Sequence, residues 1–138
     1  MLKINPMYTA EVKSTGGRNG HIKSSDGVLD FDVHTPKELG GPEGFTNPEQ
    51  LFAAGYAACF GGAIGVIAKG RDVKDFSIDA KVSLGKSDEG IYGISADLAV
   101  HFPNLSLEDA QKLVEEAHQI CPYSVATRGN IEVNVKAV

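Results

Sequence analysis

Two cysteines are the residues of this chain best suited to covalent chemistry. Cys59 and Cys121 lie far apart in the sequence and are its only cysteines. Two are too few for a disulfide scaffold or a four-cysteine zinc site. In a reducing compartment such a pair is more often inert, metal-bound or redox-catalytic than a permanent cross-link. Spacing alone favours a small apolar core residue at Cys59 and a helix-end residue at Cys121.

The four histidines offer less chemistry than the cysteines. His21, His34, His101 and His118 show no metal-ligand spacing, so we expect surface or structural roles and no metal. A cysteine–histidine hydrolase would need one of them beside Cys59. Nothing in the spacing places one there.

Cys59 falls within a long uncharged run, from 51 to 68, that predicts a helix. Thr46 is a candidate N-cap, with Pro48 in the first turn and Glu49 at the capping-box position. We expect the helix to run from 48 to about 69 and to end near Gly70.

The same run just reaches the length of a membrane-spanning helix. It consists mostly of Ala and Gly, and no basic cluster flanks it on one side. We therefore expect a long helix buried on all sides within the protein, and no membrane. The first residues form no apolar signal segment, so we expect a cytoplasmic location.

Alternating apolar and polar residues predict strands on both sides of this helix. The predicted strands cover 8–13, 21–24, 29–33, 76–84, 94–102 and 131–135. Ser106 predicts the N-cap of a second helix, and Pro122 ends that helix after Cys121. The order β-β-β-α-β-β-α-β predicts one α+β domain over residues 1–138, with mostly antiparallel sheet.

Small residues form two rows along the first predicted helix. One row is Ala53, Ala57, Gly61 and Gly65, and the other is Ala54, Ala58 and Gly62. Small residues at this spacing let two helix backbones approach closely. A chain of 138 residues has little material to surround such a helix, so we expect an intimate homodimer with paired central helices.

The composition excludes several classes of protein. Hydrophobic residues make up 42% and charged residues 22%, a balance typical of a soluble globular protein and not of a disordered chain. The net charge of −5 argues against a nucleic-acid partner, which would normally require a basic face.

Three segments resemble the organic hydroperoxide resistance (Ohr) branch of the Ohr/OsmC family. They are 46–60 around the first cysteine, 121–130 (CPYSVATRGN) from the second, and 17–20 (GRNG) in the N-terminal turn. The order of strands and helices is similar to the family over essentially the whole chain. The resemblance implies an OsmC/Ohr-like α+β fold with a long buried central helix, and a thiol-dependent peroxidase for organic hydroperoxides.

The resemblance also implies roles for both cysteines. Cys59 would attack the peroxide O–O bond, which releases an alcohol and leaves a sulfenic acid. Cys121 would then close a disulfide with it, a usual fate of a sulfenic acid beside a thiol. No bound cofactor is implied. The implied reductant is an external dithiol, a lipoyl group on a carrier protein.

By resemblance, Arg18 and Glu49 complete the site. An ordinary thiol has a pKa of about 8.5, burial raises that pKa, and the helix dipole fades within one turn, so Cys59 needs a cation. The resemblance supplies Arg18, oriented by Glu49, although a capping box also explains Glu49. Glu49 and Cys59 lie about 15 Å apart along one helix. That distance favours Arg18 and Glu49 of one chain facing Cys59 of its partner.

Two alternatives stay open from the sequence. One is an OsmC-branch peroxidase with a different substrate preference. The other is a non-catalytic binding module that takes apolar ligands in a dimer pocket. A thiol titration under peroxide separates the second from a peroxidase, because a binding module would lose no thiols.

Overall fold

A computed structural model describes residues 1–138. Its backbone contacts divide the chain into two compact units, Met1–Pro48 and Glu49–Val138. The family resemblance places chemistry in both, and each unit is described by itself below.

The first unit is a small antiparallel sheet in the order β1-β2-β3. Its elements are β1 (Val12–Thr15), the 3-10 turn η1 (Gly17–Asn19), β2 (Gly20–Ser24), β3 (Asp30–Val33) and a second 3-10 turn η2 (Lys37–Leu39). The strands predicted at 21–24 and 29–33 are confirmed. The strand predicted from residue 8 begins only at Val12, because β2 ends opposite it at Ser24 and leaves the earlier residues no ladder partner.

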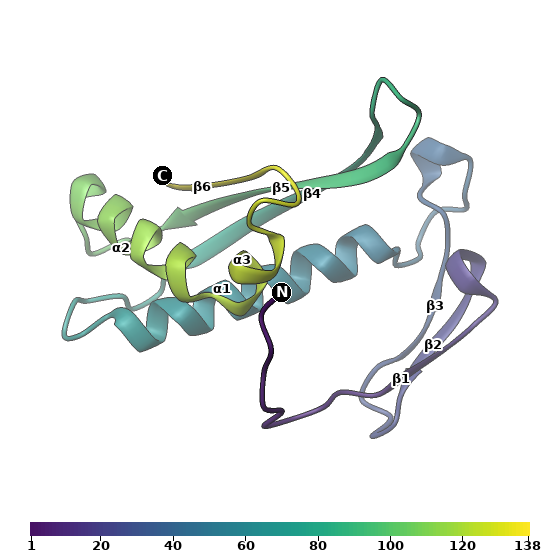
Figure 1. The fold of residues 1–138 in the computed structure, drawn as a ribbon, viewed down its shortest axis with the longest axis horizontal. Helices are drawn as coiled ribbons and strands as arrows, with labels where there is room; N and C mark the ends of the chain where they lie inside the picture. Colours follow the sequence, from purple (N-terminus) through teal and green to yellow (C-terminus); the bar gives the residue numbers. More distant parts are fainter. The chain divides into compact units, whose positions relative to one another are not determined.

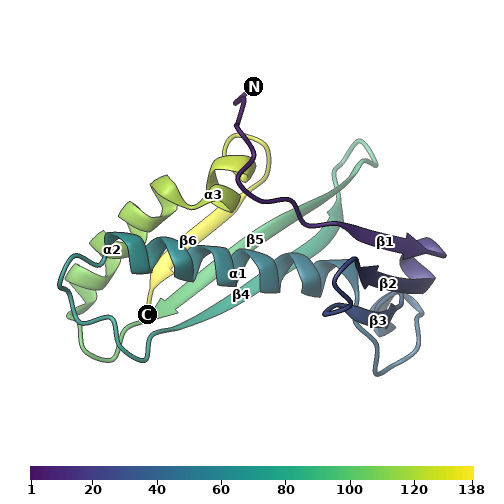
Figure 2. The same ribbon diagram turned by 90° about the horizontal axis from the view of Figure 1, so that it is seen from below.

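The second unit packs helices against one sheet. Its elements are α1 (Pro48–Ile67), β4 (Ser77–Lys86), β5 (Tyr92–His101), α2 (Leu107–Ile120), α3 (Pro122–Thr127) and β6 (Val133–Ala137). The strand order is β4-β5-β6, with an antiparallel β4–β5 pair and a parallel β5–β6 pair. All three helices lie on the same side of this sheet (Figures 1 and 2).

Alternation along the strands builds the core, as the sequence predicts. The apolar residues of β4 and β5 face each other in register, for example Ala80 opposite Leu98. The inward residues of β5 are buried together with one face of α2, which consists of Ala110, Leu113, Val114 and Ala117. Their spacing is the 3.6-residue period of an amphipathic helix. Ile120, expected on that face, is 44% exposed.

Within the second unit the long helix α1 is buried on one face, and the expected burial of its other side depends on the expected homodimer. Its fully buried residues are Tyr56, Phe60, Ala63 and Ile64. One three-stranded sheet covers one face of a helix and leaves the opposite face without a partner inside this unit. By length and composition alone α1 is apolar enough to cross a membrane, and 28% of its apolar window is buried in the structure.

Two local predictions need correction. Pro122 does end α2, but it also occupies the first position of the extra helix α3, because a proline fits a first helical turn. At the other end, α1 begins at Pro48, one residue later than a cap at Thr46 requires. Thr46 instead pairs its extended backbone with Val33.

Candidate active site

The two cysteines lie beside each other although they come from different helices. Cys59 is half-buried on α1, and Cys121 is fully buried between α2 and α3. The Cys121 thiol donates a hydrogen bond to Sγ of Cys59 over 3.7 Å. The sulfur atoms of a disulfide lie about 2.05 Å apart, so a small movement of the side chains would bring these two within bonding distance.

A break between two helices places Cys121. Its φ of −59° and ψ of 124° are not helical, because a following proline excludes the helical region. Its amide still donates to the carbonyl oxygen of Ala117 at 2.9 Å and closes the last turn of α2. Pro122 then starts α3. The thiol therefore sits at a fixed corner of the backbone rather than in a loose loop.

The surroundings of Cys59 oppose its ionisation. Burial raises the pKa of the Cys59 thiol, and the neighbouring Cys121 adds to this effect. A hydrogen bond from the Tyr123 backbone acts in the other direction and lowers that pKa. Cys59 also lies about three turns into α1, too far from the N-terminus for the helix dipole to help. A thiolate at this position therefore requires a positive charge.

The predicted cation lies in the first unit. Arg18 is half-buried in the η1 turn. The backbone of that turn is set by Gly16 and Gly17, with φ values of 81° and 61°, in the left-handed region that glycine adopts without strain. A Cβ atom on Gly20, the residue after the turn, would lie 1.9 Å from the carbonyl oxygen of Thr15, so a larger residue would clash there. The pairing of Arg18 with Cys59 stays a prediction.

Glu49 lies at the second position of α1 and is half-buried. The helical rise separates it from Cys59 by about 15 Å along the axis, because the two positions are ten residues apart. The structure therefore groups Cys59 with Cys121, and it keeps Glu49 of the same chain away from both.

A buried hydroxyl cluster that sequence reasoning missed lies beside the cysteines. The Tyr56 hydroxyl is hydrogen-bonded to Ser124 Oγ at 3.0 Å and to Thr127 Oγ1 at 3.2 Å. His118 Nδ1 is hydrogen-bonded to Ser124 Oγ at 2.8 Å. Tyr56 and Ser124 each lie three residues from a cysteine, one helical turn, and that spacing is the signal that could have found them.

The other histidine contacts agree with structural roles. His21 lies between Asp30 and Asp32, at 2.6 and 2.7 Å. Its hydrogen bonds to Asp32 and Asp30 raise the pKa of the His21 imidazole. Burial and then the charge of Arg128 lower the pKa of His118.

An apolar hollow of about 360 Å³ lies against the side chain of Tyr123, two residues after Cys121. It is lined by Phe52, Ile94, Tyr123, Ala126, Thr127, Asn130 and Ile131. The rings of Phe52, Tyr56 and Tyr123 contact one another, with centroids 5.5 to 6.1 Å apart. Tyr123 links this hollow to the cysteines, because its side chain lines the hollow and its backbone is hydrogen-bonded to Cys59.

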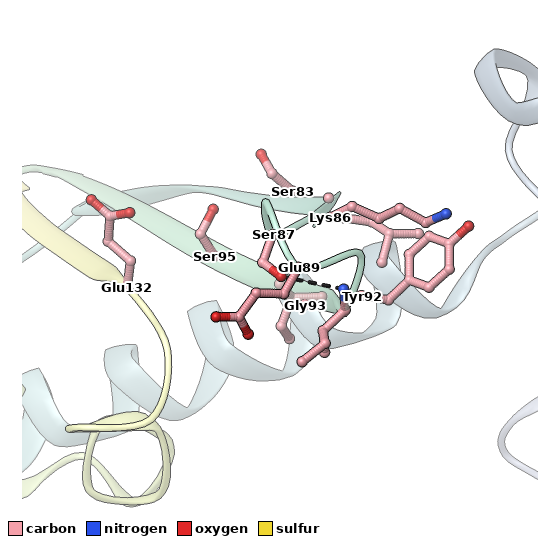
Figure 3. A pocket seen from close by; sticks show the side chains of 12 residues that line it. Ser83, Lys86, Ser87, Glu89, Tyr92, Gly93, Ser95 and Glu132 are labelled. Carbon is pink, nitrogen blue, oxygen red and sulfur yellow. Dashed lines mark hydrogen bonds between the residues drawn. The ribbon is translucent and has the colours of Figure 1, made fainter.

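A second hollow, of about 570 Å³, lies at the loop end of the β4–β5 hairpin (Figure 3). Its lining is more apolar than polar, and its polar members include Ser83, Lys86, Ser87 and Glu89. The amide of Ile91 donates to Ser87 Oγ at 3.2 Å across the loop. Tyr123, which connects the first hollow to Cys59, does not line this one, and we assign it no part in the chemistry.

Comparison with known proteins shows the family of this chain. The family model for OsmC-like proteins matches residues 40–136. The chain belongs to the OsmC-like family. It is 50% identical over 132 residues to the organic hydroperoxide resistance protein OhrB of Bacillus subtilis, and this match covers 94% of the chain and 97% of OhrB. The organic hydroperoxide resistance protein of Xanthomonas axonopodis pv. citri is also 50% identical, with 94% and 93% covered.

Solved structures place the chain in the Ohr branch of this OsmC-like family. The organic hydroperoxide resistance protein of Legionella pneumophila has a TM-score of 0.89 and 44% identity, with 96% of this chain and 98% of that chain covered. Other solved members are only 17–19% identical, with TM-scores of 0.68 to 0.83, and share the fold alone. The expected α+β fold and the expected branch of the family are both confirmed.

Proposed function

We propose that this chain is a two-cysteine peroxidase that reduces organic hydroperoxides to alcohols. The observation that carries the proposal is the 3.7 Å contact between the sulfur atoms of Cys59 and Cys121. Relatives that are 50% identical over nearly their whole length are named organic hydroperoxide resistance proteins, which supports a role in peroxide detoxification.

The reaction begins at the Cys59 thiolate. Its sulfur attacks one oxygen of the O–O bond, and the other oxygen leaves and takes up a proton as the alcohol. Two electrons pass from the sulfur to the peroxide, and Cys59 becomes a sulfenic acid. Cys121 then attacks that sulfur, a water molecule leaves, and a disulfide joins the two residues. An external dithiol returns two electrons, and a lipoyl group on a carrier protein is our candidate for it.

Ionisation of Cys59 requires the guanidinium of Arg18 in this proposal. Burial raises the pKa of the thiol, so a fixed positive charge must offset it. A guanidinium keeps its charge at every relevant pH, and its planar donors can also hold a peroxide oxygen. Glu49 would orient it through a bidentate pair. Glu49 and Cys59 of one chain lie about 15 Å apart along the helix axis, because they are ten residues apart. This separation favours a site in which Arg18 and Glu49 belong to the partner chain.

A second copy of the chain also suits the uncovered face of α1. Ala54, Ala58, Gly62 and Val66 recur every fourth residue on that face and are all exposed. Two such faces can pack closely because their side chains are small. The homodimer would bury both central helices and complete each site. We expect it in the cytoplasm, where thiols stay reduced between turnovers.

The hollow beside Cys59 explains a preference for organic substrates. An alkyl tail buried there gains about 0.8 kcal/mol per CH₂ group, whereas hydrogen peroxide gains nothing. Three methylene groups would favour the organic substrate by about 2.4 kcal/mol, on the order of fifty-fold in kcat/KM.

Steady-state turnover with three peroxides tests this function. Hydrogen peroxide, a small alkyl hydroperoxide and a fatty-acid hydroperoxide are compared at equal dithiol concentration. We expect kcat/KM to rise by on the order of fifty-fold for the first three buried methylene groups. Equal values for hydrogen peroxide and the alkyl substrate would refute the role of the hollow, even if both are reduced.

A binding module for apolar ligands is the second candidate, favoured only by the apolar hollow. It predicts tight binding of a hydrophobic ligand with both thiols intact after peroxide treatment. Loss of two thiols per chain after one equivalent of organic hydroperoxide excludes it.

A further inference from the structure

The buried hydroxyl cluster has no part in the steps described above. It consists of Tyr56 on α1, Ser124 and Thr127 on α3, and His118 on α2. Tyr56 and Ser124 are 0% exposed, and Thr127 is 6% exposed. Each buried polar side-chain atom of the structure has a hydrogen-bond partner. The cluster is therefore a satisfied polar network inside an otherwise apolar core.

The network connects all three helices at the level of the cysteines. Tyr56 lies one turn before Cys59 on α1, and Ser124 lies one turn after Cys121. The hydrogen bond between Tyr56 and Ser124 therefore spans the same helix contact as the two sulfur atoms. His118 holds Ser124 from the α2 side of the corner.

The cluster also ties down the short helix α3. The Thr127 hydroxyl donates to the carbonyl oxygen of Tyr123 at 2.9 Å. The Arg128 guanidinium donates to the carbonyl oxygen of His118 at 2.7 Å and fastens the end of α3 to α2. A helix of six residues has little stability of its own, so these bonds determine its orientation.

Apolar contacts alone would not fix this orientation. Hydrophobic burial is non-directional, so a helix held only by it can rotate or slide at small cost. A buried hydroxyl without a hydrogen-bond partner is destabilising by its full desolvation free energy. Only one arrangement of α1 and α3 gives every hydroxyl of the network a partner. That arrangement is the one that holds the Cys121 thiol against Cys59.

We propose that Tyr56, Ser124 and His118 are positioning residues that hold the Cys121 sulfur beside Cys59 for disulfide closure. They touch neither the peroxide nor the reacting sulfur atoms. Their role in peroxide turnover rests on the proposed function, but their effect on disulfide stability does not.

Equilibrium with glutathione tests the positioning without any peroxide. Oxidised glutathione takes two electrons from the two protein thiols, which yields the protein disulfide and two reduced glutathione molecules. The equilibrium constant measures the effective concentration of one cysteine at the other. Tyr56→Phe and Ser124→Ala, which keep the shape of the core, should each lower it about fivefold to tenfold.

Ser106→Ala is the matched control. It also removes a hydroxyl with two hydrogen bonds, here both to Asp109, but at the far end of α2. It should leave the glutathione equilibrium unchanged while it lowers the melting temperature. If Tyr56→Phe and Ser124→Ala behave as Ser106→Ala does, the positioning role is overturned.

A peroxide experiment then separates the two proposals. Folded Tyr56→Phe and Ser124→Ala proteins should form the Cys59 sulfenic acid at the wild-type rate. They should close the disulfide about fivefold more slowly and accumulate more sulfinic acid under excess peroxide. Wild-type protein that does not react with hydroperoxide would overturn the proposed function alone. Wild-type closure rates in both variants would overturn the positioning role alone.

Discussion

At the residue scale, the proposed chemistry depends on the half-buried Cys59 thiol, which its own helix does not activate. Burial raises the pKa of Cys59, and only the hydrogen bond from the Tyr123 backbone lowers it within the second unit. The thiolate is the nucleophile, so the rate of the first step follows its ionised fraction. In the proposed mechanism a fixed cation is therefore the main factor that makes the first step fast at neutral pH.

The pH profile of the first step tests the role of Arg18. The reacting thiolate is the deprotonated form of Cys59. The rate should therefore rise about tenfold per pH unit below the thiol pKa and level off above it. Arg18→Ala should shift the whole profile to higher pH and slow the reaction at neutral pH by orders of magnitude. Arg18→Lys should restore only part of the rate, because a point charge lacks the planar fork. Stopped-flow measurement of sulfenic acid formation gives the profile.

Glu49→Ala is the comparison within the same experiment. It leaves the charge of Arg18 in place and removes only its orientation, so the expected loss is smaller than for Arg18→Ala. If the pH profile of Arg18→Ala coincides with that of the wild type, Arg18 has no role in the ionisation of Cys59.

At the element scale, local signals predicted most of the helices and strands. Ser106 is a clear case, since its hydroxyl accepts a hydrogen bond from the Asp109 amide at 3.1 Å as an N-cap should. Ser106→Ala should lower the free energy of unfolding by about 1 kcal/mol. Urea unfolding measures this, and a change below a few tenths of a kcal/mol would mean that the cap is not needed.

The errors at this scale have physical reasons. A proline signals both the end of one helix and the first turn of the next, so Pro122 did not reveal α3 from sequence alone. The alternation at residues 8–11 satisfied the strand pattern, but a strand also needs a partner, and β2 ends too early to supply one. The parallel pairing of β6 depends on the crossover through α2, which periodicity does not encode.

The candidate site was predictable from the sequence only in part. The residues alone left Cys59 open to a plain core role, and the resemblance implied its pairing with Cys121. The fold brings the two within 3.7 Å because the corner at Pro122 faces α1. The hydroxyl cluster was not predicted, because Tyr56 and Ser124 are 68 positions apart and meet only when the helices pack.

At the scale of the whole molecule, the exposed row on α1 is the face that the proposed second chain would cover. Gly61, expected on a partner-facing row, faces Phe76 of its own chain instead, where a Cβ atom would lie 3.5 Å from the ring. The exposed row through Ala58 and Gly62 is therefore the face to test.

Ala58→Asp tests the dimer directly. A buried charge without a partner costs several kcal/mol, so this variant should be monomeric or unfolded at micromolar concentration. Ser83→Asp, on the exposed side of β4, should sediment as the wild type does. Analytical ultracentrifugation distinguishes the outcomes. A compact, active Ala58→Asp monomer would refute both the paired helices and the shared site.

Mass spectrometry after one equivalent of an alkyl hydroperoxide tests the central claim most directly. The wild-type chain should lose two hydrogen atoms as the Cys59–Cys121 disulfide forms. Cys121→Ser should gain one oxygen on Cys59 and then stall, and Cys59→Ser should stay unchanged. An oxygen gained by Cys59→Ser while Cys121→Ser stays unchanged would contradict the assignment of the two cysteines, and a wild-type chain that keeps all its thiol hydrogens would contradict the peroxidase itself.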